Sequence, residues 1–302
     1  MNPELRLPAL RRFAVAITVL NILGQTVLGF EQSLAQLLAA ILTAYTMELV
    51  LETAESWSLG RKPRYLGGGP RRVVDFLLAP HITGCAVSML LYANSRIWPV
   101  VFAATVAIAS KFLFRAPIDG GMRHHLNPSN FGITVTLLTF PWVAITPPYH
   151  FTEHIRGAAD WVLPALIILS GSFLNAKFTK KVPLILGWVG AFVVQAVLRG
   201  TLTETSTIAA LLPMTGVAFI LFTFYMVTDP ATTPTSTRAQ FLFGATVALT
   251  YGLLVRYHVV FGFFFALTIV TAARGALLWI EAWARRTAPA KLPVPSTDYA
   301  ST

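Results

Sequence analysis

Long apolar stretches separated by short polar segments dominate the chain. Each approaches or exceeds the roughly 20 residues that a transmembrane helix needs, and helix-breaking segments such as GGGPRR at 67–72 and DPATTPTSTR at 229–238 lie between them. The apolar stretches cover residues 13–30, 33–53, 73–94, 97–115, 130–147, 161–178, 182–199, 209–228, 240–257 and 259–284. This pattern predicts an all-α, polytopic membrane protein with about ten transmembrane helices.

The first stretch, 13–30, has the charged flank of a secretory signal peptide, with Arg6, Arg11 and Arg12 before it. Its 18 residues exceed the usual length of about 7–15 residues for the apolar region of a signal, and no convincing small-residue cleavage site follows. We therefore predict an uncleaved first helix.

The composition indicates that lipid, rather than water, is the main solvent of the folded chain. Of its 302 residues, 55% are hydrophobic and 12% are charged, whereas soluble domains carry about 25% charged residues. Ten helices leave no room for a separate soluble domain, so residues 1–286 are expected to form a single transmembrane domain. The stretch 287–302 is predicted to be a disordered cytoplasmic tail.

Positive charge is distributed unevenly over the predicted loops. When the loops are assigned to alternate sides, one side carries 19 cations and the other carries four. The larger set is Arg6, Arg11, Arg12, Arg61, Lys62, Arg64, Arg71, Arg72, Lys111, Arg115, Arg123, Lys177, Lys180, Lys181, Arg238, Arg274, Arg285, Arg286 and Lys291. The smaller set is Arg96, Arg156, Arg199 and Arg256. Because Lys and Arg accumulate on the cytoplasmic side, we predict a multi-pass protein of the inner (plasma) membrane with both termini in the cytoplasm.

The same distribution explains the net charge of +10. Nucleic-acid binding would require the cations to cluster on one solvated face, and nucleic acid is therefore not an expected partner.

Five predicted helices in each half of the chain would insert a duplicated unit upside down, as in many transporters. Two inverted halves are a hypothesis for the architecture, without a clear repeat in the sequence.

Three carboxylates share one face of the second predicted helix, because Glu48, Glu52 and Glu55 follow spacings of four and three residues. Glu52 and Glu55 lie near the inner end and are expected to be solvated, whereas Glu48 lies roughly 8 Å inside that end. His81 of the third helix is expected at a similar depth. Ionisable residues inside a membrane are functional candidates, so Glu48 and His81 are candidates for a proton or ion path. The alternative is a neutral Glu48 bonded to a neighbouring helix.

The remaining histidines predict neither a haem nor a metal site. A six-coordinate haem needs a second axial ligand at the depth of the first, and the other histidines lie in or beside loops: His124, His125, His150, His154 and His258. His150 and His154 are interpreted as an interfacial loop pair, because no Glu or Cys completes a zinc pattern. The single cysteine, Cys85, excludes an internal disulfide.

The loop after the fourth predicted helix gathers cations around a Gly-Gly turn. It reads SKFLFRAPIDGGMRHHLNPSNFGI from 110 to 133 and contains Lys111, Arg115, Arg123, His124 and His125. This composition suits a phosphate or carboxylate, and cytoplasmic charge with snorkelling side chains is the alternative reading. The NPSN segment that follows, with Asn127 and Asn130, suits backbone that lines a cavity where the chain re-enters the membrane.

Two later loops are also unusual. The segment FYMVTDPATTPTSTRAQ, 224–240, places Thr228 and Asp229 at a helix end, although a helix stop and cap would explain them equally. The segment RGTLTETSTIAALLP, 199–213, contains Ser206 and Thr207 among several hydroxyl residues. A polar exit loop is the alternative reading there.

NPSNFGI at 127–133 and YMVTDPATTPTSTRAQFLFG at 225–244 together resemble one family. They look like the membrane subunits called D in the Rnf electron-transport complex and B in the sodium-translocating NADH:quinone oxidoreductase. The predicted helix count, loop order and orientation agree with this family over most of the chain. The spellings SKFLFR and HHLNPSNFGI are similar to a stand-alone branch encoded in enediyne-antibiotic biosynthetic clusters.

The resemblance implies a flavin cofactor, FMN or riboflavin. In the family, one FMN is joined through its phosphate to a threonine of an S-G-A-T sequence on the outer side. Here the equivalent stretch reads ETSTIAAL at 204–211, with Thr207 as the best-placed acceptor, Ser206 in place of Ala and Thr205 in place of Gly. A side chain at the Gly position narrows the approach of the phosphoryl donor, so we expect a flavin held without a covalent bond.

Two functions remain open. The first is an integral membrane electron-transfer protein that binds flavin, auxiliary to a biosynthetic pathway and working with other membrane or redox subunits. Its expected cofactor-binding residues are Lys111, Arg115, Arg123, Asn127, Asn130, Ser206, Thr207, Thr228 and Asp229. The alternative is a non-redox transporter or channel of the same fold, with Glu48 and His81 along its path. The absence of GxSxG, HExxH and P-loop motifs excludes a soluble-type hydrolase.

Overall fold

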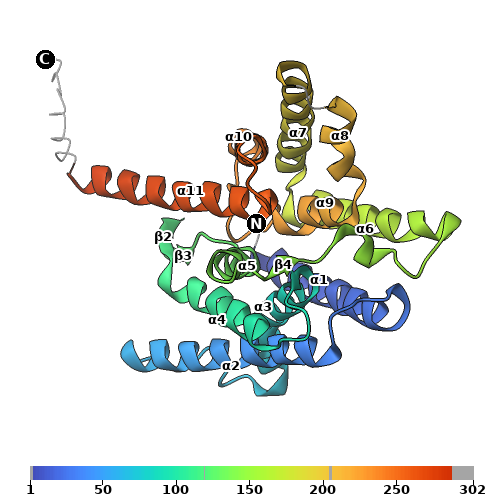
Figure 1. Ribbon diagram of the computed structural model, residues 1–302. Helices are drawn as coiled ribbons and strands as arrows, with labels where there is room; N and C mark the ends of the chain where they lie inside the picture. Colours follow the sequence, from blue (N-terminus) through green and yellow to red (C-terminus); the bar gives the residue numbers. More distant parts are fainter. Residues whose placement is uncertain (1–2, 119, 204–205, 288–302) are drawn as a thin grey trace, which may run out of the picture.

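The computed structural model describes residues 3–118, 120–203 and 206–287, which are predominantly helical (Figure 1). The α-helices are α1 (Pro3–Leu23), α2 (Leu34–Ser58), α3 (Gly69–Leu90), α4 (Trp98–Leu113), α5 (Pro128–Thr139), α6 (Val162–Phe173), α7 (Val182–Leu202), α8 (Thr207–Leu211), α9 (Val217–Leu221), α10 (Thr237–Arg256) and α11 (Gly262–Thr287). The predicted disordered tail, apart from Thr287 at the end of α11, lies outside the described residues.

Short segments connect or extend these helices. The π-helical segments are η1 (Gly24–Leu28) after α1, η4 (Leu174–Thr179) after α6 and η6 (Phe222–Met226) after α9. The 3₁₀ segments are η2 (Pro148–Phe151), η3 (Gly157–Trp161) and η5 (Leu212–Thr215). Two antiparallel pairs of strands join β1 (Leu91–Tyr92) to β4 (Ala144–Ile145) and β2 (Arg115–Ile118) to β3 (Gly121–His124).

Seven helical segments of the described chain are long and apolar enough to cross a membrane. An eighth is formed if Thr207–Thr215 and Val217–Met226, which are bent by 67° at their junction, count as one span. The seven are Leu7–Leu28, Leu34–Ser58, Gly69–Leu90, Gly157–Thr179, Val182–Leu202, Thr237–Arg256 and Gly262–Thr287. The prediction of an all-α, polytopic membrane protein is confirmed, but the described residues contain seven or eight candidate spans instead of about ten.

Besides the bent stretch 209–228, two of the ten apolar stretches form shorter helices than expected, since α4 has 16 residues and α5 has 12. The stretch 130–147 is helical only as far as Thr139, and its later residues form a turn and β4. Pro141 and Pro147 account for this, because proline lacks the N–H of a helix interior and disfavours a helical residue before it. The apolar character of this stretch therefore does not produce one continuous helix.

The same pattern of helix neighbours occurs in the two halves of the chain. In the first half, α1 contacts α3, α2 contacts α3 and α4, and α4 contacts α5. In the second half, α6 contacts α9, α7 contacts α8 and α10, and α10 contacts α11. The first helix of each half also ends in a π-helix capped by a left-handed residue, Gly29 or Lys180. These shared features support a division into two structural halves.

Aromatic side chains fill the core of the second half. The ring of Trp188 on α7 packs against Phe192, Phe219 and Phe263, and its Nε1 donates a hydrogen bond to Thr223 Oγ1 at 2.9 Å. The bond satisfies the polar atom of a fully buried indole. This core fixes α7 against α9, η6 and α11.

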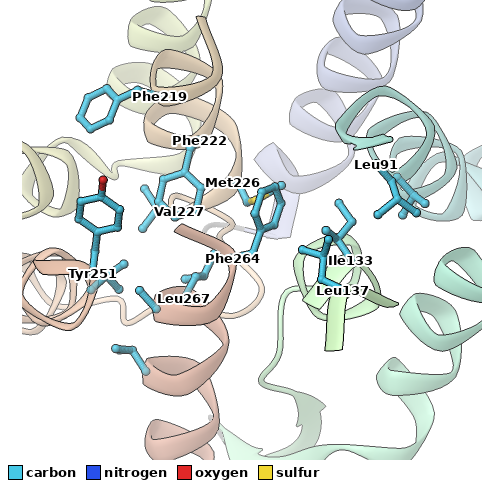
Figure 2. Packing of buried hydrophobic residues seen from close by; sticks show 14 of the residues in the cluster. Leu91, Ile133, Leu137, Phe219, Phe222, Met226, Val227, Tyr251, Phe264 and Leu267 are labelled. Carbon is cyan, nitrogen blue, oxygen red and sulfur yellow. The ribbon is translucent and has the colours of Figure 1, made fainter. Parts of the chain in front are cut away.

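The hydrophobic core continues from the second half into the first. Figure 2 shows Phe264 of α11 between Phe222 and Tyr251 on one side and Ile133 of α5 on the other. All four residues belong to one cluster of buried side chains. The apolar residues of α11 therefore hold the two halves together.

Glycines allow α7 and α10 to approach closely. A Cβ on Gly187 would lie 2.1 Å from the carbonyl oxygen of Phe241, and a Cβ on Gly244 would lie 2.2 Å from the carbonyl oxygen of Leu184. Small residues at helix contacts are characteristic of packing in membranes, where close backbone contact contributes to helix association. The pairing of α7 with α10 thus depends on these two positions.

Candidate functional site

One large cavity runs between the two halves of the molecule. Its volume is about 1510 Å³, and its wall includes α1 and α3 of the first half and α6, α9 and η6 of the second. Residues of α2, α4, the β2–β3 hairpin, α5, η4, α11 and the segment 228–235 also belong to the wall. Ligand sites of membrane transport proteins commonly lie at the interface of two structural repeats. This cavity is therefore the candidate site.

Charged side chains line the part of the cavity between α2, α4, the β2–β3 hairpin and the start of α3, which we call the basic end. Eight cations belong to the cavity wall: Arg61, Lys62, Arg64, Arg72, Lys111, Arg115, Arg123 and Arg274. Four carboxylates accompany them: Glu48, Glu55, Asp75 and Asp229. The excess of positive charge favours an anionic ligand.

Glu48 and Lys111 form a buried ion pair at the basic end. Lys111 Nζ of α4 donates to Glu48 Oε2 of α2 at 2.5 Å, and both side chains are at most 13% exposed. Both residues line the cavity. The predicted intramembrane carboxylate is therefore bonded to a cation of a neighbouring helix.

Glu52 does not have the solvated environment that the sequence suggested. Its side chain is fully buried, with Arg61 Nη1 at 2.6 Å and Arg64 Nε at 2.7 Å. The backbone N–H of Arg64 donates to the same carboxylate at 2.8 Å. These bonds raise the pKa of Arg61, chiefly through its hydrogen bond to Glu52. The segment after α2 folds back because two of its arginines close over this carboxylate.

The β2–β3 hairpin carries Arg115 and Arg123 to the cavity, where the sequence predicted a loop. Arg115 forms an ion pair with Glu55 of α2. The carbonyl oxygen of Arg115 accepts a hydrogen bond from Trp279 Nε1 of α11 at 2.9 Å. The turn uses Gly120 at φ +77°, a conformation that glycine adopts without strain. The hairpin is thus bonded to both α2 and α11.

The NPSN and TDP segments, which the resemblance singled out, meet in space. Asn127 Oδ1 accepts the N–H of Asn130 at 3.1 Å and so caps α5. Asn127 Nδ2 contacts the carbonyl oxygen of Met226 at 3.2 Å and Asp229 Oδ2 at 3.5 Å. Thr228 Oγ1 donates to the carbonyl oxygen of Phe224 at 2.7 Å. Asn127, Thr228 and Asp229 all line the cavity.

Two further residues of this region, Lys181 and Arg274, were not singled out in the sequence, whereas His125 belongs to the basic loop. Lys181 is buried and its Nζ donates to the carbonyl oxygen of Pro234 at 2.6 Å. Burial lowers the pKa of Lys181 to about 8, although Asp229 acts in the opposite direction. Arg274 of α11 donates to the carbonyl oxygen of Thr232 at 3.1 Å. Burial, with a smaller contribution from Arg274, also lowers the pKa of His125.

Lys181 and Arg274 lie between or on apolar helices, so their positions in the sequence gave no signal beyond positive charge on one side. The structure shows that Lys181 and Arg274 both donate to backbone oxygens of the segment 229–235. They hold this segment beside the cavity.

Asn130 does not line the cavity, although it was predicted to bind cofactor. Its Nδ2 donates to the carbonyl oxygen of Phe264 at 3.0 Å and to Thr268 Oγ1 at 2.8 Å. Thr134 Oγ1 contacts the same two oxygens. Asn130 therefore joins α5 to α11.

Ser206 and Thr207 also lie outside the wall of the cavity. Ser206 caps α8, since its Oγ accepts the N–H of Ala209 at 3.5 Å. A Cβ on Gly200 would lie 2.1 Å from Thr207 Oγ1, so this hydroxyl packs against α7. Glu204 and Thr205 lie outside the described residues.

His81 belongs to a separate polar group and does not pair with Glu48. His81 Nε2 lies 2.7 Å from Thr18 Oγ1, and Nδ1 lies 2.8 Å from the Tyr45 hydroxyl. Thr18 uses its hydrogen to donate to the carbonyl oxygen of Ala14, so it accepts from His81 Nε2–H and Nδ1 accepts from Tyr45. Glu48 bonds Lys111 of α4 and lines the cavity, whereas His81 lies outside the cavity wall, so the two residues of the predicted path belong to separate polar groups.

His150 is buried, in contrast to the interfacial loop pair predicted with His154. Its ring stacks on Phe30 with centroids 3.9 Å apart, and its Nδ1 accepts the N–H of Glu31 at 3.4 Å. Burial lowers the pKa of His150 to about 4. Within the described residues, no three His, Cys, Asp or Glu side chains gather as metal ligands.

Comparison with known proteins assigns no family. No family model matches the chain, and no curated protein matches it. Function is therefore inferred from the residues and the cavity that they form.

Proposed function

We propose that the protein is an integral membrane electron carrier that holds a flavin, FMN or riboflavin, without a covalent bond at the basic end. One observation carries this proposal: predicted cofactor-binding residues from two separate stretches of sequence, 111–127 and 228–229, line a single cavity. These residues are Lys111, Arg115, Arg123, Asn127, Thr228 and Asp229. The resemblance of the NPSN and TDP segments to flavin-holding membrane subunits supports the same function.

The charge of the basic end suits a flavin phosphate. Arg115 and Arg123 carry guanidinium groups, which bind phosphate oxygens in a bidentate manner. Phe112 and Phe222 also line the cavity and offer flat surfaces to an isoalloxazine ring. A bound flavin supplies the redox chemistry, while the side chains of the cavity bind it, orient it and tune its charge.

The surroundings of Thr207 favour non-covalent binding. A phosphoryl donor needs access to the hydroxyl, and the Thr207 hydroxyl packs against Gly200 of α7. In this proposal the basic end faces the cytoplasm, where both termini lie, and electrons pass between the flavin and other membrane or redox subunits.

The visible absorption spectrum of the detergent-purified protein tests the proposal. We expect the bands of oxidised flavin, and acid precipitation should release the colour into the supernatant. Arg123→Gln should weaken flavin retention about tenfold, or about 1.4 kcal/mol. Arg238→Gln, an exposed arginine outside the cavity wall, should leave it unchanged.

Two results would contradict the proposal in different ways. Colour that stays with the precipitated chain and is lost in Thr207→Ala would establish a covalent flavin. A colourless preparation that remains colourless after incubation with FMN and with riboflavin would reject flavin binding.

A transporter is the second candidate, and one observation favours it. Residues of α1 line the cavity from Leu7 to Leu23, which corresponds to about 24 Å along the helix and to most of a hydrocarbon core of about 30 Å. The Glu48–Lys111 pair lies in the same wall. If the protein is colourless, proton release or uptake by proteoliposomes that changes in Glu48→Gln would support this candidate.

A further inference from the structure

The cavity has a second part that the flavin proposal does not use. On α1, α6 and α9 its wall contains no charged side chain. Typical residues of this part are Ile17, Leu20, Leu163, Ile167 and Leu221. We call it the apolar arm. A polar ligand such as a ribityl phosphate gains nothing from such a surface, whereas a hydrocarbon chain gains roughly 25 cal/mol for each Å² of apolar surface that is buried.

The size of the cavity leaves room for two ligands. Sites for single small molecules usually enclose about 300–1,000 Å³, and this cavity encloses about 1510 Å³. The apolar arm follows α1 over about 24 Å, while an acyl chain that fills half of a hydrocarbon core extends about 15 Å. A linear chain of ordinary lipid length therefore fits along α1.

Several aliphatic residues of the arm are exposed. Val19, Leu23 and Leu166 line the cavity and are 48%, 38% and 56% exposed. All three belong to segments that are apolar enough to span a membrane. A ligand can therefore enter from the bilayer without crossing a charged surface.

Arginine side chains line the cavity where the apolar arm meets the basic end. Arg72 and Arg64 line the cavity there, and Arg72 Nε donates to the carbonyl oxygen of Arg64 at 2.7 Å. Asp75, one turn further along α3, is bonded to Arg11 of α1 at 2.7 Å. The carboxylate nearest to Arg72 along α3 is thus neutralised by an arginine of α1.

We infer that the apolar arm binds a single-chain anionic amphiphile, with its chain along α1 and its head group at Arg72, since Arg64 is already bonded to Glu52. The head group is a carboxylate or a phosphate monoester, since arginine binds both through the same charge-assisted hydrogen bonds. This ligand is additional to the flavin, and its binding does not require that a flavin be present.

Spin-labelled stearic acid, with the nitroxide near the methyl end, is the probe for the experiment. When the probe is mixed with the purified protein in neutral detergent, the electron paramagnetic resonance spectrum of the probe should contain a strongly immobilised component. Unlabelled palmitate or hexadecyl phosphate should displace it, and the stronger of these competitors identifies the head group. Hexadecanol, which lacks the charge, should compete at least tenfold more weakly. Equal competition by hexadecanol would overturn the anionic head group.

Two matched pairs of variants locate the site. Ala16→Trp fills the wall of the arm, whereas Val15→Trp places the same ring on a neighbouring residue that is exposed and outside the wall. Arg72→Gln removes a cation of the wall, whereas Arg71→Gln removes its exposed neighbour outside the wall. We expect a tenfold or greater loss of probe affinity in the first member of each pair and less than a twofold change in the second.

The flavin content of the same preparations separates this inference from the proposed function. Ala16→Trp should keep any flavin, and Arg123→Gln should keep the immobilised probe. Absence of the immobilised component in the wild-type protein, or an equal loss in Ala16→Trp and Val15→Trp, would overturn the apolar-arm site whether or not the protein is yellow.

Discussion

Asn127 and Asp229 are 102 residues apart in sequence, yet the Asn127 amide lies 3.5 Å from the Asp229 carboxylate. Each side chain also orders its own segment, because Asn127 caps α5 and Asp229 Oδ1 accepts the N–H of Ala231 at 3.0 Å. The two segments that the resemblance singled out are therefore coupled through side chains at the wall of the cavity.

Loss of the Asn127 cap should destabilise the protein, with Asn127→Ala costing about 1–2 kcal/mol. A double-mutant cycle with Asp229→Ala should give a coupling energy of at least about 0.5 kcal/mol, because the two side chains share contacts. Denaturant unfolding in micelles measures both quantities. Ser33→Ala, which removes the cap of α2, should add to Asp229→Ala without coupling. Additivity of the Asn127 pair would show that the contact has no energetic role.

Removal of one partner of the buried Glu48–Lys111 pair should cost more stability than removal of both partners. Glu48→Gln removes the carboxylate that Lys111 bonds, and loss of one partner of a buried pair costs about 3–5 kcal/mol. The double variant Glu48→Gln with Lys111→Met should recover a large part of that loss, because it no longer buries the amine. Thermal unfolding of the wild type, Glu48→Gln and the double variant tests this expectation. A double variant less stable than Glu48→Gln would contradict it.

The contact between α7 and α10 gives a prediction with a control on the same helix. Gly187→Ala forces the added methyl group against the carbonyl oxygen of Phe241, and such overpacking typically costs about 1–3 kcal/mol. Gly190→Ala meets no atom within 4 Å and should stabilise α7 by up to about 1 kcal/mol through helix propensity. Equal melting temperatures of the two variants would refute the close approach.

Acidification should destabilise the protein through His150. An unfolded histidine binds its proton near pH 6.5, whereas burial lowers the pKa of His150 to about 4 in the folded chain. Between these values the unfolded state binds more protons, so the free energy of unfolding falls as the pH falls. The loss approaches about 3 kcal/mol near pH 4. The free energy of unfolding is measured for wild type and for His150→Phe from pH 7.5 down to pH 4.5. The difference between the two values should shrink as the pH falls, because only the wild type contains the buried histidine. A constant difference would contradict it.

The proposed topology places Thr203 and Arg238 on opposite sides of the membrane. In a Cys85→Ala background, single cysteines at these positions should react differently with a membrane-impermeant maleimide added to intact cells. Cysteine at position 203 should be labelled and cysteine at position 238 protected until the cells are opened. Labelling of both positions in intact cells would reject the arrangement.

The helices could be predicted from sequence wherever a long apolar stretch continues without a break, and Pro80 inside α3 did not alter this. The prediction lost accuracy at 130–147, because Pro141 and Pro147 end helical structure inside a stretch that is still apolar. It also treated 209–228 as one helix, whereas the structure bends there by 67°. Hydropathy reports which residues avoid water, and it does not report the backbone direction that they follow.

The site was predictable in part because the basic loop and the NPSN and TDP segments have distinctive composition. Their convergence on one cavity could not be derived, since it depends on contacts between residues far apart in sequence. Glu52 illustrates the limit. Its position near a helix end suggested solvation, but Arg61 and Arg64 fold back over it. Lys181 and Arg274 carried no signal beyond their charge.

The ion pair of α2 also constrains how the protein enters the membrane during synthesis. Lys111 follows Glu48 by 63 residues, so α2 emerges from the ribosome well before the cation that neutralises its buried carboxylate. An unpaired carboxylate at the centre of a lone helix is costly in lipid. The insertion machinery must therefore accommodate α2 until α4 has been made, and α2, α3 and α4 are expected to leave the insertion site as one unit.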